Sequence, residues 1–352
     1  MTLNLKDINL PLYDNKTLVI AGPCSAESEE QVLTTAKELN ANGCKIFRAG
    51  VWKPRTKPGG FEGHGEPALR WLKKVKEQTG MLISTEVATP EHVELAKKYD
   101  VDILWIGART STNPFAMQAL ADSLKDFDKP VFVKNPLNPD IELWIGALQR
   151  LNKAGVKKLG AIHRGFSSYE PKTYRNATVW QIPIELRRRI PGLPILCDPS
   201  HIGGQRQFVL PLSQQAMDLR FDGLIIESHC EPECAWSDAA QQVTPNQLNE
   251  ILSKLVVKDG SLVTDELNEK RKLIDELDNN LMDILARRME ICRQIGEYKK
   301  CHNMTVLQSG RYDEILNKRG FQGEKMGMSA DFAKKIFETI HDESIRQQIE
   351  LK

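Results

Sequence analysis

The sequence predicts a (β/α)8 TIM barrel followed by a small all-helical domain. From Thr17 to residue 255, short apolar runs alternate with amphipathic helical stretches. Eight strand–helix units within about 240 residues are typical of a TIM barrel. After residue 264 the strand-like runs stop, and apolar residues recur at intervals of three and four, which indicates helices.

The predicted strands consist mainly of apolar or β-branched residues, as expected for parallel strands that are buried on both faces. They are Leu18–Ala21, Lys45–Arg48, Met81–Thr85, Ile103–Ile106, Val131–Lys134, Lys158–His163, Ile195–Asp198 and Leu224–Glu227. Helical stretches between them include Ser28–Asn40, Pro67–Gln78, Pro90–Tyr99 and Asp140–Asn152. A doubly wound sheet would also alternate, but its first turn usually carries a glycine-rich dinucleotide fingerprint. The first turn here reads Gly22-Pro23-Cys24-Ser25, so we favour the barrel.

A long helix is predicted from about Thr264 to Lys300, because Ile274, Leu277 and Leu281 share one helical face. Two shorter helices, Arg311–Arg319 and Ala330–Gln348, should follow, separated by a break at residues 320–323. A helix of some 36 residues would be about 54 Å long. One short helix cannot cover that length, so we expect an intertwined homodimer or a larger assembly.

Length and composition favour a soluble globular protein of two domains. The change of pattern places a barrel over residues 1–257, a linker at 258–264 and helices over 265–352. The chain has 352 residues, 27% of them charged, with a formal net charge of +1, so no general basic field indicates nucleic acid. The apolar runs are too short to span a membrane. Seven irregularly spaced cysteines do not form a disulfide framework, and we expect a cytoplasmic protein.

Cationic side chains lie at or just after the ends of most predicted strands. In a TIM barrel these ends meet at the catalytic face. A single Lys or Arg is usually a solvated surface charge. Six of them in these positions predict that the mouth of the barrel binds substrates with several negative charges. They are Arg48, Lys53, Arg55, Arg109, Lys134 and Arg164. Nucleic acid would additionally require exposed aromatic residues between the cations, and the sequence lacks them.

A second group at the strand ends comprises Cys24, His201, Glu227 and Asp238. Taken singly, a cysteine after a strand is more often a small buried apolar residue than a ligand. Together, however, a thiolate, an imidazole and two carboxylates can hold a divalent transition-metal ion.

These segments make residues 16–255 resemble 3-deoxy-D-arabino-heptulosonate 7-phosphate (DAHP) synthases. Because no further domain precedes the barrel, we expect the short, type Iβ-like form. The resemblance is carried by Gly22–Ser25, Arg48, Lys53-Pro54-Arg55-Thr56, Gly107-Ala108-Arg109, Lys134, Arg164-Gly165, Asp198-Pro199-Ser200-His201 and Glu227-Ser228-His229. The related synthase that uses arabinose 5-phosphate shares the Gly-Pro-Cys turn but lacks the Lys-Pro-Arg-Thr stretch, which is intact here.

The resemblance implies a role for each of these side chains. Cys24, His201, Glu227 and Asp238 would bind the metal, which we expect to be Mn²⁺, with Zn²⁺, Co²⁺ and Fe²⁺ as alternatives. Arg109, Lys134 and Arg164 would bind the phosphate of phosphoenolpyruvate, with Arg48 and Lys53 near its carboxylate. Arg55 and Thr56 would bind the phosphate of erythrose 4-phosphate. We expect Lys53 also to donate a proton to the aldehyde oxygen.

Arg288 lies within the apolar stripe of the long helix, where a charge is costly unless it is paired or binds an anion. Lys299 lies on the same face, whereas Arg271 points about 100° away. Arg271 therefore cannot serve the same pocket on its own helix, but in a dimer it can serve the pocket of the partner subunit. The alternative, which we favour for Arg271 taken alone, is an exposed, salt-bridged helix surface.

From Leu267 onward the chain resembles the small all-helical chorismate mutases. The resemblance is carried by Arg271, Ala286-Arg287-Arg288, Gly296, Lys299, Arg311, Ser344 and Gln348. It implies that Arg271 of one subunit, with Arg288 and Arg311 of the other, binds the carboxylates of chorismate, and that Lys299 and Gln348 face its ether oxygen. Gln308 and Tyr312 stand where family members often carry acidic residues. The alternative is therefore a non-catalytic module for dimerisation and feedback sensing, and in either case we expect prephenate to inhibit the barrel.

Overall fold

The computed structural model describes residues 3–14, 16–53, 59–125, 127–168, 173–258, 264–307 and 309–350. It divides into two compact units, Met1–Gly260 and Ser261–Lys352. No helix in the described ranges is both long enough and apolar enough to cross a membrane.

The first unit is a closed barrel of eight parallel strands in sequence order, which confirms the predicted TIM barrel. The strands are β1 (Leu18–Gly22), β2 (Ile46–Arg48), β3 (Leu82–Val87), β4 (Ile103–Ile106), β5 (Val131–Lys134), β6 (Leu159–His163), β7 (Ile195–Cys197) and β8 (Gly223–Glu227). The barrel closes where β1 pairs with β8, from Leu18 opposite Gly223 to Gly22 opposite Glu227. Each predicted strand is confirmed, with ends that differ by at most two residues.

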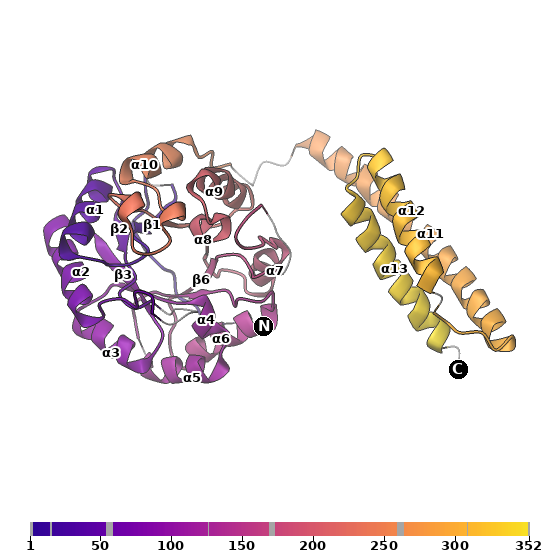
Figure 1. The fold of residues 1–352 in the computed structure, drawn as a ribbon, viewed down its shortest axis with the longest axis horizontal. Coiled ribbons are helices and arrows are strands. Elements are labelled where there is room, and N and C mark those ends of the chain that lie inside the picture. Colours follow the sequence, from indigo (N-terminus) through magenta and orange to yellow (C-terminus); the bar gives the residue numbers. More distant parts are fainter. Residues whose placement is uncertain are drawn as a thin grey trace. The chain divides into compact units, whose positions relative to one another are not determined.

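Helices surround the strands in a ring (Figure 1). They are α1 (Glu29–Ala41), α2 (Glu66–Thr79), α3 (Pro90–Lys98), α4 (Ala108–Ser111), α5 (Pro114–Ser123), α6 (Ile141–Lys153), α7 (Gln181–Arg189), α8 (Pro199–Gly203), α9 (Val209–Asp218) and α10 (Pro245–Lys254). Short 3₁₀ turns, which include η1 (Arg206–Phe208), η2 (Pro232–Cys234) and η3 (Ala239–Gln241), lie in the connections. The main apolar core fills the layer between strands and helices. A smaller cluster, which includes Ile20, Phe132 and Ile225, is formed almost entirely by strand residues.

Gly22 allows the ends of β1 and β2 to approach closely. A Cβ atom at this position would lie 2.0 Å from the carbonyl oxygen of Arg48, and the backbone φ is +149°. Any larger residue would push the two strand ends apart. This contact therefore brings the turn that carries Cys24 next to Arg48.

The second unit contains α11 (Asp265–Cys301), α12 (Ser309–Lys325) and α13 (Ala330–Glu350), with α13 packed against both others (Figure 1). The long helix and the all-helical class are confirmed. The predicted break at residues 320–323 is wrong, because α12 continues through it. A Cβ atom at Gly323 would lie 2.6 Å from the Cβ atom of Ala333, so this glycine permits close packing of α12 on α13 instead of ending a helix.

Candidate active site

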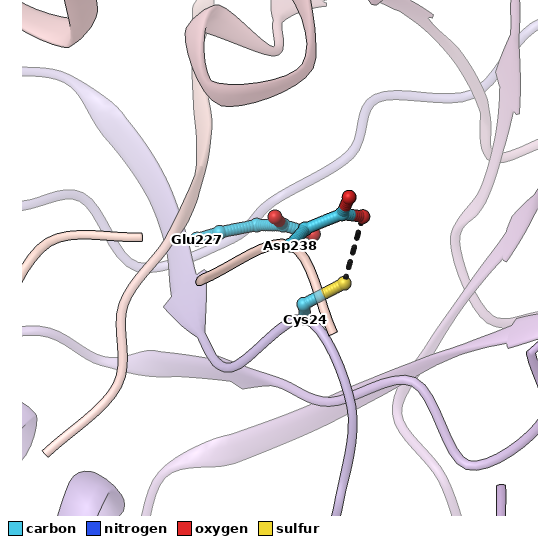
Figure 2. Close-up of side chains that lie close together, drawn as sticks. All are labelled: Cys24, Glu227 and Asp238. Carbon is cyan, nitrogen blue, oxygen red and sulfur yellow. Dashed lines mark hydrogen bonds between the residues drawn. The ribbon is translucent and has the colours of Figure 1, made fainter. Parts of the chain in front are cut away.

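Cys24, Glu227 and Asp238 converge at the C-terminal end of the barrel (Figure 2). Cys24 follows β1, Glu227 ends β8, and Asp238 lies in the loop after β8 with a left-handed backbone φ of +47°. One ligand atom of each lies within 4.8 Å of the others, and Cys24 Sγ is 3.4 Å from Asp238 Oδ2. Cys24 and Glu227 are fully buried.

His201, the fourth predicted ligand, lies beside this group instead of within it. Its Nε2 is 3.6 Å from Glu227 Oε1, and its Nδ1 is 2.8 Å from Asp198 Oδ2. Asp198 also accepts the backbone N–H of His201 and so caps α8. A carboxylate on one ring nitrogen leaves the other nitrogen to bind a ligand, as is common for metal-binding histidines.

The donor set fits a divalent transition metal, since it combines one sulfur, one imidazole nitrogen and carboxylate oxygens. Burial, reinforced by the charge of Glu227, raises the pKa of the Cys24 thiol to about 12. The thiol is therefore protonated at neutral pH in the absence of an ion. Ion binding must displace that proton, so affinity should rise with pH.

Lys53 approaches the same thiol. Its Nζ lies 2.9 Å from Cys24 Sγ and 3.2 Å from the Cys24 carbonyl oxygen. Burial alone would lower the pKa of Lys53, but Cys24 and Glu227 outweigh it and raise the pKa above the usual value. Lys53 therefore carries a proton at the edge of the site.

A cavity of about 210 Å³ opens next to these residues. Its lining is mainly charged and comprises Lys53, Glu86, Ala108, Arg109, Lys134, Leu137, Arg164, Arg175, His201 and Asp238. Four of the six predicted cations therefore meet at one mouth. Arg55, with Thr56, lies outside the residues that the structure describes.

Arg48, at the end of β2, is buried beside Glu227 with 2% of its surface exposed. Its Nη2 contacts Glu227 Oε1 at 3.2 Å, and its guanidinium lies 4.9 Å from the centre of the Trp105 ring. Nε and Nη1 are buried and have no hydrogen-bond partner among the described residues. Buried guanidinium nitrogens without partners are suited to a carboxylate or phosphate ligand.

The cations are crowded. Burial, together with the charges of Arg175 and Arg109, lowers the pKa of Arg164 to about 10. Lys134 is paired with Asp198 at 2.8 Å, where both side chains are buried. Arg164 is still charged at neutral pH, so an anion in this cavity would relieve the repulsion among the cations.

Sequence reasoning missed Arg175 and Glu86. Arg175 lies in the loop after β6, away from any strand end, and donates to Asp238 Oδ1 and Gln241 Oε1, both at 2.9 Å. Glu86 lies near the end of β3 and accepts from Trp105 Nε1 at 2.9 Å. An acidic residue at the end of a strand could have been noticed, whereas nothing in the sequence marks Arg175.

A buried carboxylate, Glu27, connects the two loops that hold Cys24 and Asp238. Its Oε1 accepts from Ser25 Oγ at 2.9 Å and from the Trp236 backbone N–H at 2.8 Å. The hydroxyl of Ser25 lies 2.6 Å from that of Ser237. Glu27 therefore stabilises the relative position of the two loops.

In the helical unit, Arg288 of α11 donates to Ser344 Oγ of α13 at 2.6 Å. Lys299 donates to the carbonyl oxygen of Val306 at 2.6 Å. Gln348 Oε1 is buried and has no hydrogen-bond partner among the described residues. Two predicted site residues lie apart from this group: Arg311, which is exposed and pairs with Glu314 on its own helix, and Arg271, which is exposed on α11.

Residues 12–264 match the model of the DAHP synthetase I family. A phospho-2-dehydro-3-deoxyheptonate aldolase from Thermotoga maritima is 35% identical over 237 residues, which cover 67% of this chain and 68% of that protein. The chain belongs to the DAHP synthetase I family. Residues 270–349 match the type II chorismate mutases, so the chain combines a DAHP synthase with a chorismate mutase domain.

Other proteins are also similar to this chain. A 2-dehydro-3-deoxyphosphooctonate aldolase from Syntrophotalea carbinolica is 29% identical over 74% of this chain and 96% of its own. The crystal structure of the Thermotoga maritima DAHP synthase superposes with a TM-score of 0.61 at 32% identity, covering 74% of this chain and 70% of that one. A truncated form of the Thermotoga enzyme gives a TM-score of 0.58 at 30% identity, covering 74% of this chain and 88% of that one.

Proposed function

We propose that the barrel joins phosphoenolpyruvate to erythrose 4-phosphate in a metal-dependent reaction that forms DAHP and phosphate. One observation carries this proposal: the Cys24–Glu227–Asp238 group adjoins a cavity lined by Lys53 and four further basic side chains, and buried Arg48 pairs with Glu227. Arg109, Lys134 and Arg164 would hold the phosphate of phosphoenolpyruvate, and Arg48 would bind the carboxylate of the same substrate. Arg55 and Thr56 would bind the phosphate of the second substrate.

The chemistry requires an aldehyde oxygen to gain negative charge while C3 of phosphoenolpyruvate attacks the aldehyde carbon. A divalent ion held by Cys24, His201, Glu227 and Asp238 would supply Lewis-acid polarisation of that aldehyde. Lys53, protonated and next to Cys24, is placed to give its proton to the new alkoxide. Water then adds at C2 and inorganic phosphate leaves, while the surrounding arginines stabilise the charge.

Treatment with a chelator should abolish DAHP formation by the full-length chain and leave chorismate turnover unchanged, because only the barrel has a candidate metal site among the described residues. Phosphate release from the two substrates and chorismate loss measure the two reactions. DAHP synthesis should return when Mn²⁺ is added. The rates restored by Zn²⁺, Co²⁺ and Fe²⁺ are then compared with the rate in Mn²⁺. Full DAHP synthesis after exhaustive metal removal would contradict the metal role.

We also propose that the helical unit, residues 265–352 after a linker at 258–264, converts chorismate to prephenate as a homodimer. A pericyclic rearrangement needs cations that fix the two carboxylates and stabilise the ether oxygen, and it needs no nucleophile. Arg288 and Lys299 offer such cations in one subunit, Gln348 adds a neutral amide donor, and Arg271 would come from the partner. The long apolar stripe of α11 supports a dimer, because Leu277, Leu281 and Ile284 expose 67%, 53% and 61% of their surfaces in one chain.

Leu281→Glu should convert the dimer to a 39.8 kDa monomer and remove mutase activity, because a charge in a buried apolar contact costs several kcal/mol. Light scattering after gel filtration measures the mass. Asp283→Lys, on the opposite face of α11, is the matched control and should stay dimeric. A Leu281→Glu protein that remains a dimer would show that this stripe is not the interface.

Prephenate, bound to the helical unit, should inhibit the barrel. Removing residues 259–352 should therefore abolish inhibition of DAHP synthesis by added prephenate while leaving the uninhibited rate within a few-fold of its original value. Inhibition that persists in the shortened chain would place the inhibitor site on the barrel. If the helical unit only senses ligands, the full-length chain should be inhibited and yet fail to consume chorismate.

All seven cysteines are unpaired, which is consistent with a reducing compartment, and we propose that the protein works in the cytoplasm.

A further inference from the structure

Three polar residues of α13 form one stripe beside Arg288. His341, Ser344 and Gln348 are spaced by three and four residues, so they share a helix face. Ser344 already bonds to Arg288. By contrast, His341 Nε2 and Gln348 Oε1 are buried without a hydrogen-bond partner among the described residues. A buried polar atom without a partner costs about 1–3 kcal/mol, so two of them on one face indicate a ligand that completes the site.

The surroundings of His341 favour a neutral imidazole. Burial, together with the charges of Arg288 and Lys299 on α11, lowers the pKa of His341 below its usual value, and Asp342 on its own helix opposes this only partly. From α12, Tyr312 lies against the imidazole with its ring centre 4.6 Å away and the planes 35° apart. At neutral pH Nε2 can thus accept a proton in a hydrogen bond.

Tyr312 stands at one of the two positions where family members often carry an acidic residue, so a carboxylate acceptor is missing there. The ring hydroxyl is the hydrogen-bond donor of chorismate once its carboxylates are ionised. Against Tyr312 lies an imidazole whose Nε2 has no partner among the described residues. We propose that His341 is a substrate-binding residue of the mutase site that accepts the ring hydroxyl of chorismate at Nε2, with Tyr312 as a positioning residue. This rests on the proposed function of the helical unit.

Two substitutions in the full-length chain separate this role from a structural one. Glutamine places a carbonyl oxygen near the position of Nε2 and does not titrate, whereas leucine has a similar bulk and no acceptor. His341→Leu should lower kcat/KM for chorismate about 10- to 100-fold, the usual effect of leaving one buried ligand group unpaired. His341→Gln should restore most of the activity.

The pH profile provides a second readout. Protonation of His341 removes the acceptor, so kcat/KM of the unmodified chain should fall as pH drops through the lowered pKa of His341, below its ordinary value of about 6.5. The His341→Gln chain should lack this decline. His302→Gln, an exposed histidine at the end of α11, is the matched control and should leave the profile unchanged. Thermal melting of each variant shows whether it folds.

Calorimetric binding of chorismate is measured alongside turnover. A chain that binds chorismate without converting it would refute the mutase function, and the binding loss in His341→Leu would still test this inference. Unchanged kcat/KM and binding in His341→Leu, or an identical pH profile in His341→Gln, would overturn the role of His341.

Discussion

Cys24→Ala should lower DAHP synthesis more than about 100-fold and leave chorismate turnover intact. Loss of a residue that merely hydrogen-bonds to a metal ligand typically lowers metal affinity 10- to 100-fold. Loss of the predicted ligand atom itself, Cys24 Sγ, should therefore lower it further. With Co²⁺, the unmodified chain should show a thiolate-to-metal absorption band that the variant lacks. The band should strengthen with increasing pH, because the pKa of the Cys24 thiol is raised to about 12 and binding must displace its proton.

Cys44→Ala is the matched control, since Cys44 is equally buried but has no place at the strand ends that form the site. It should retain the band and the synthase rate, although its melting temperature can fall. Full activity and an unchanged metal content in Cys24→Ala would rule out Cys24 as a ligand.

Arg288→Ala should lower chorismate turnover by about 10²–10³-fold, the usual cost of removing one donor that stabilises developing charge. The synthase rate without inhibitor should not change. Inhibition by prephenate should weaken in parallel, because the same guanidinium would bind a carboxylate of that ligand. The measurements are chorismate loss and phosphate release, each with and without prephenate.

Arg287→Ala provides the control on the same helix, because Arg287 is exposed whereas Arg288 is half-buried and bonded to Ser344. Equal losses of chorismate turnover in the Arg287→Ala and Arg288→Ala chains would indicate a general effect of charge on α11 instead of a specific site. Loss of inhibition without loss of turnover would separate the sensing role from the catalytic one.

Much of the barrel site was predictable because parallel strands present all their C-terminal ends to one face. Cys24, Lys53 and Arg164 are far apart in sequence, yet each follows a strand and so must meet the others. The loops obey no such periodic rule. Arg175 reaches Asp238 from a loop whose path only the folded chain defines, and the sequence contains no sign of it.

In the helical unit, the sequence determined the long helix and the charged position within its apolar stripe, because helical spacing alone brings these residues onto one face. It did not distinguish a glycine that ends a helix from one that admits a neighbouring helix, since both positions simply lack a Cβ atom. Gly323 against Ala333 was therefore decided only by tertiary packing. The same holds for His341, whose spacing is visible in the sequence. Only the packing of α11 and α12 against α13 buries its Nε2, which has no hydrogen-bond partner in the described part of the chain and so is available to a ligand.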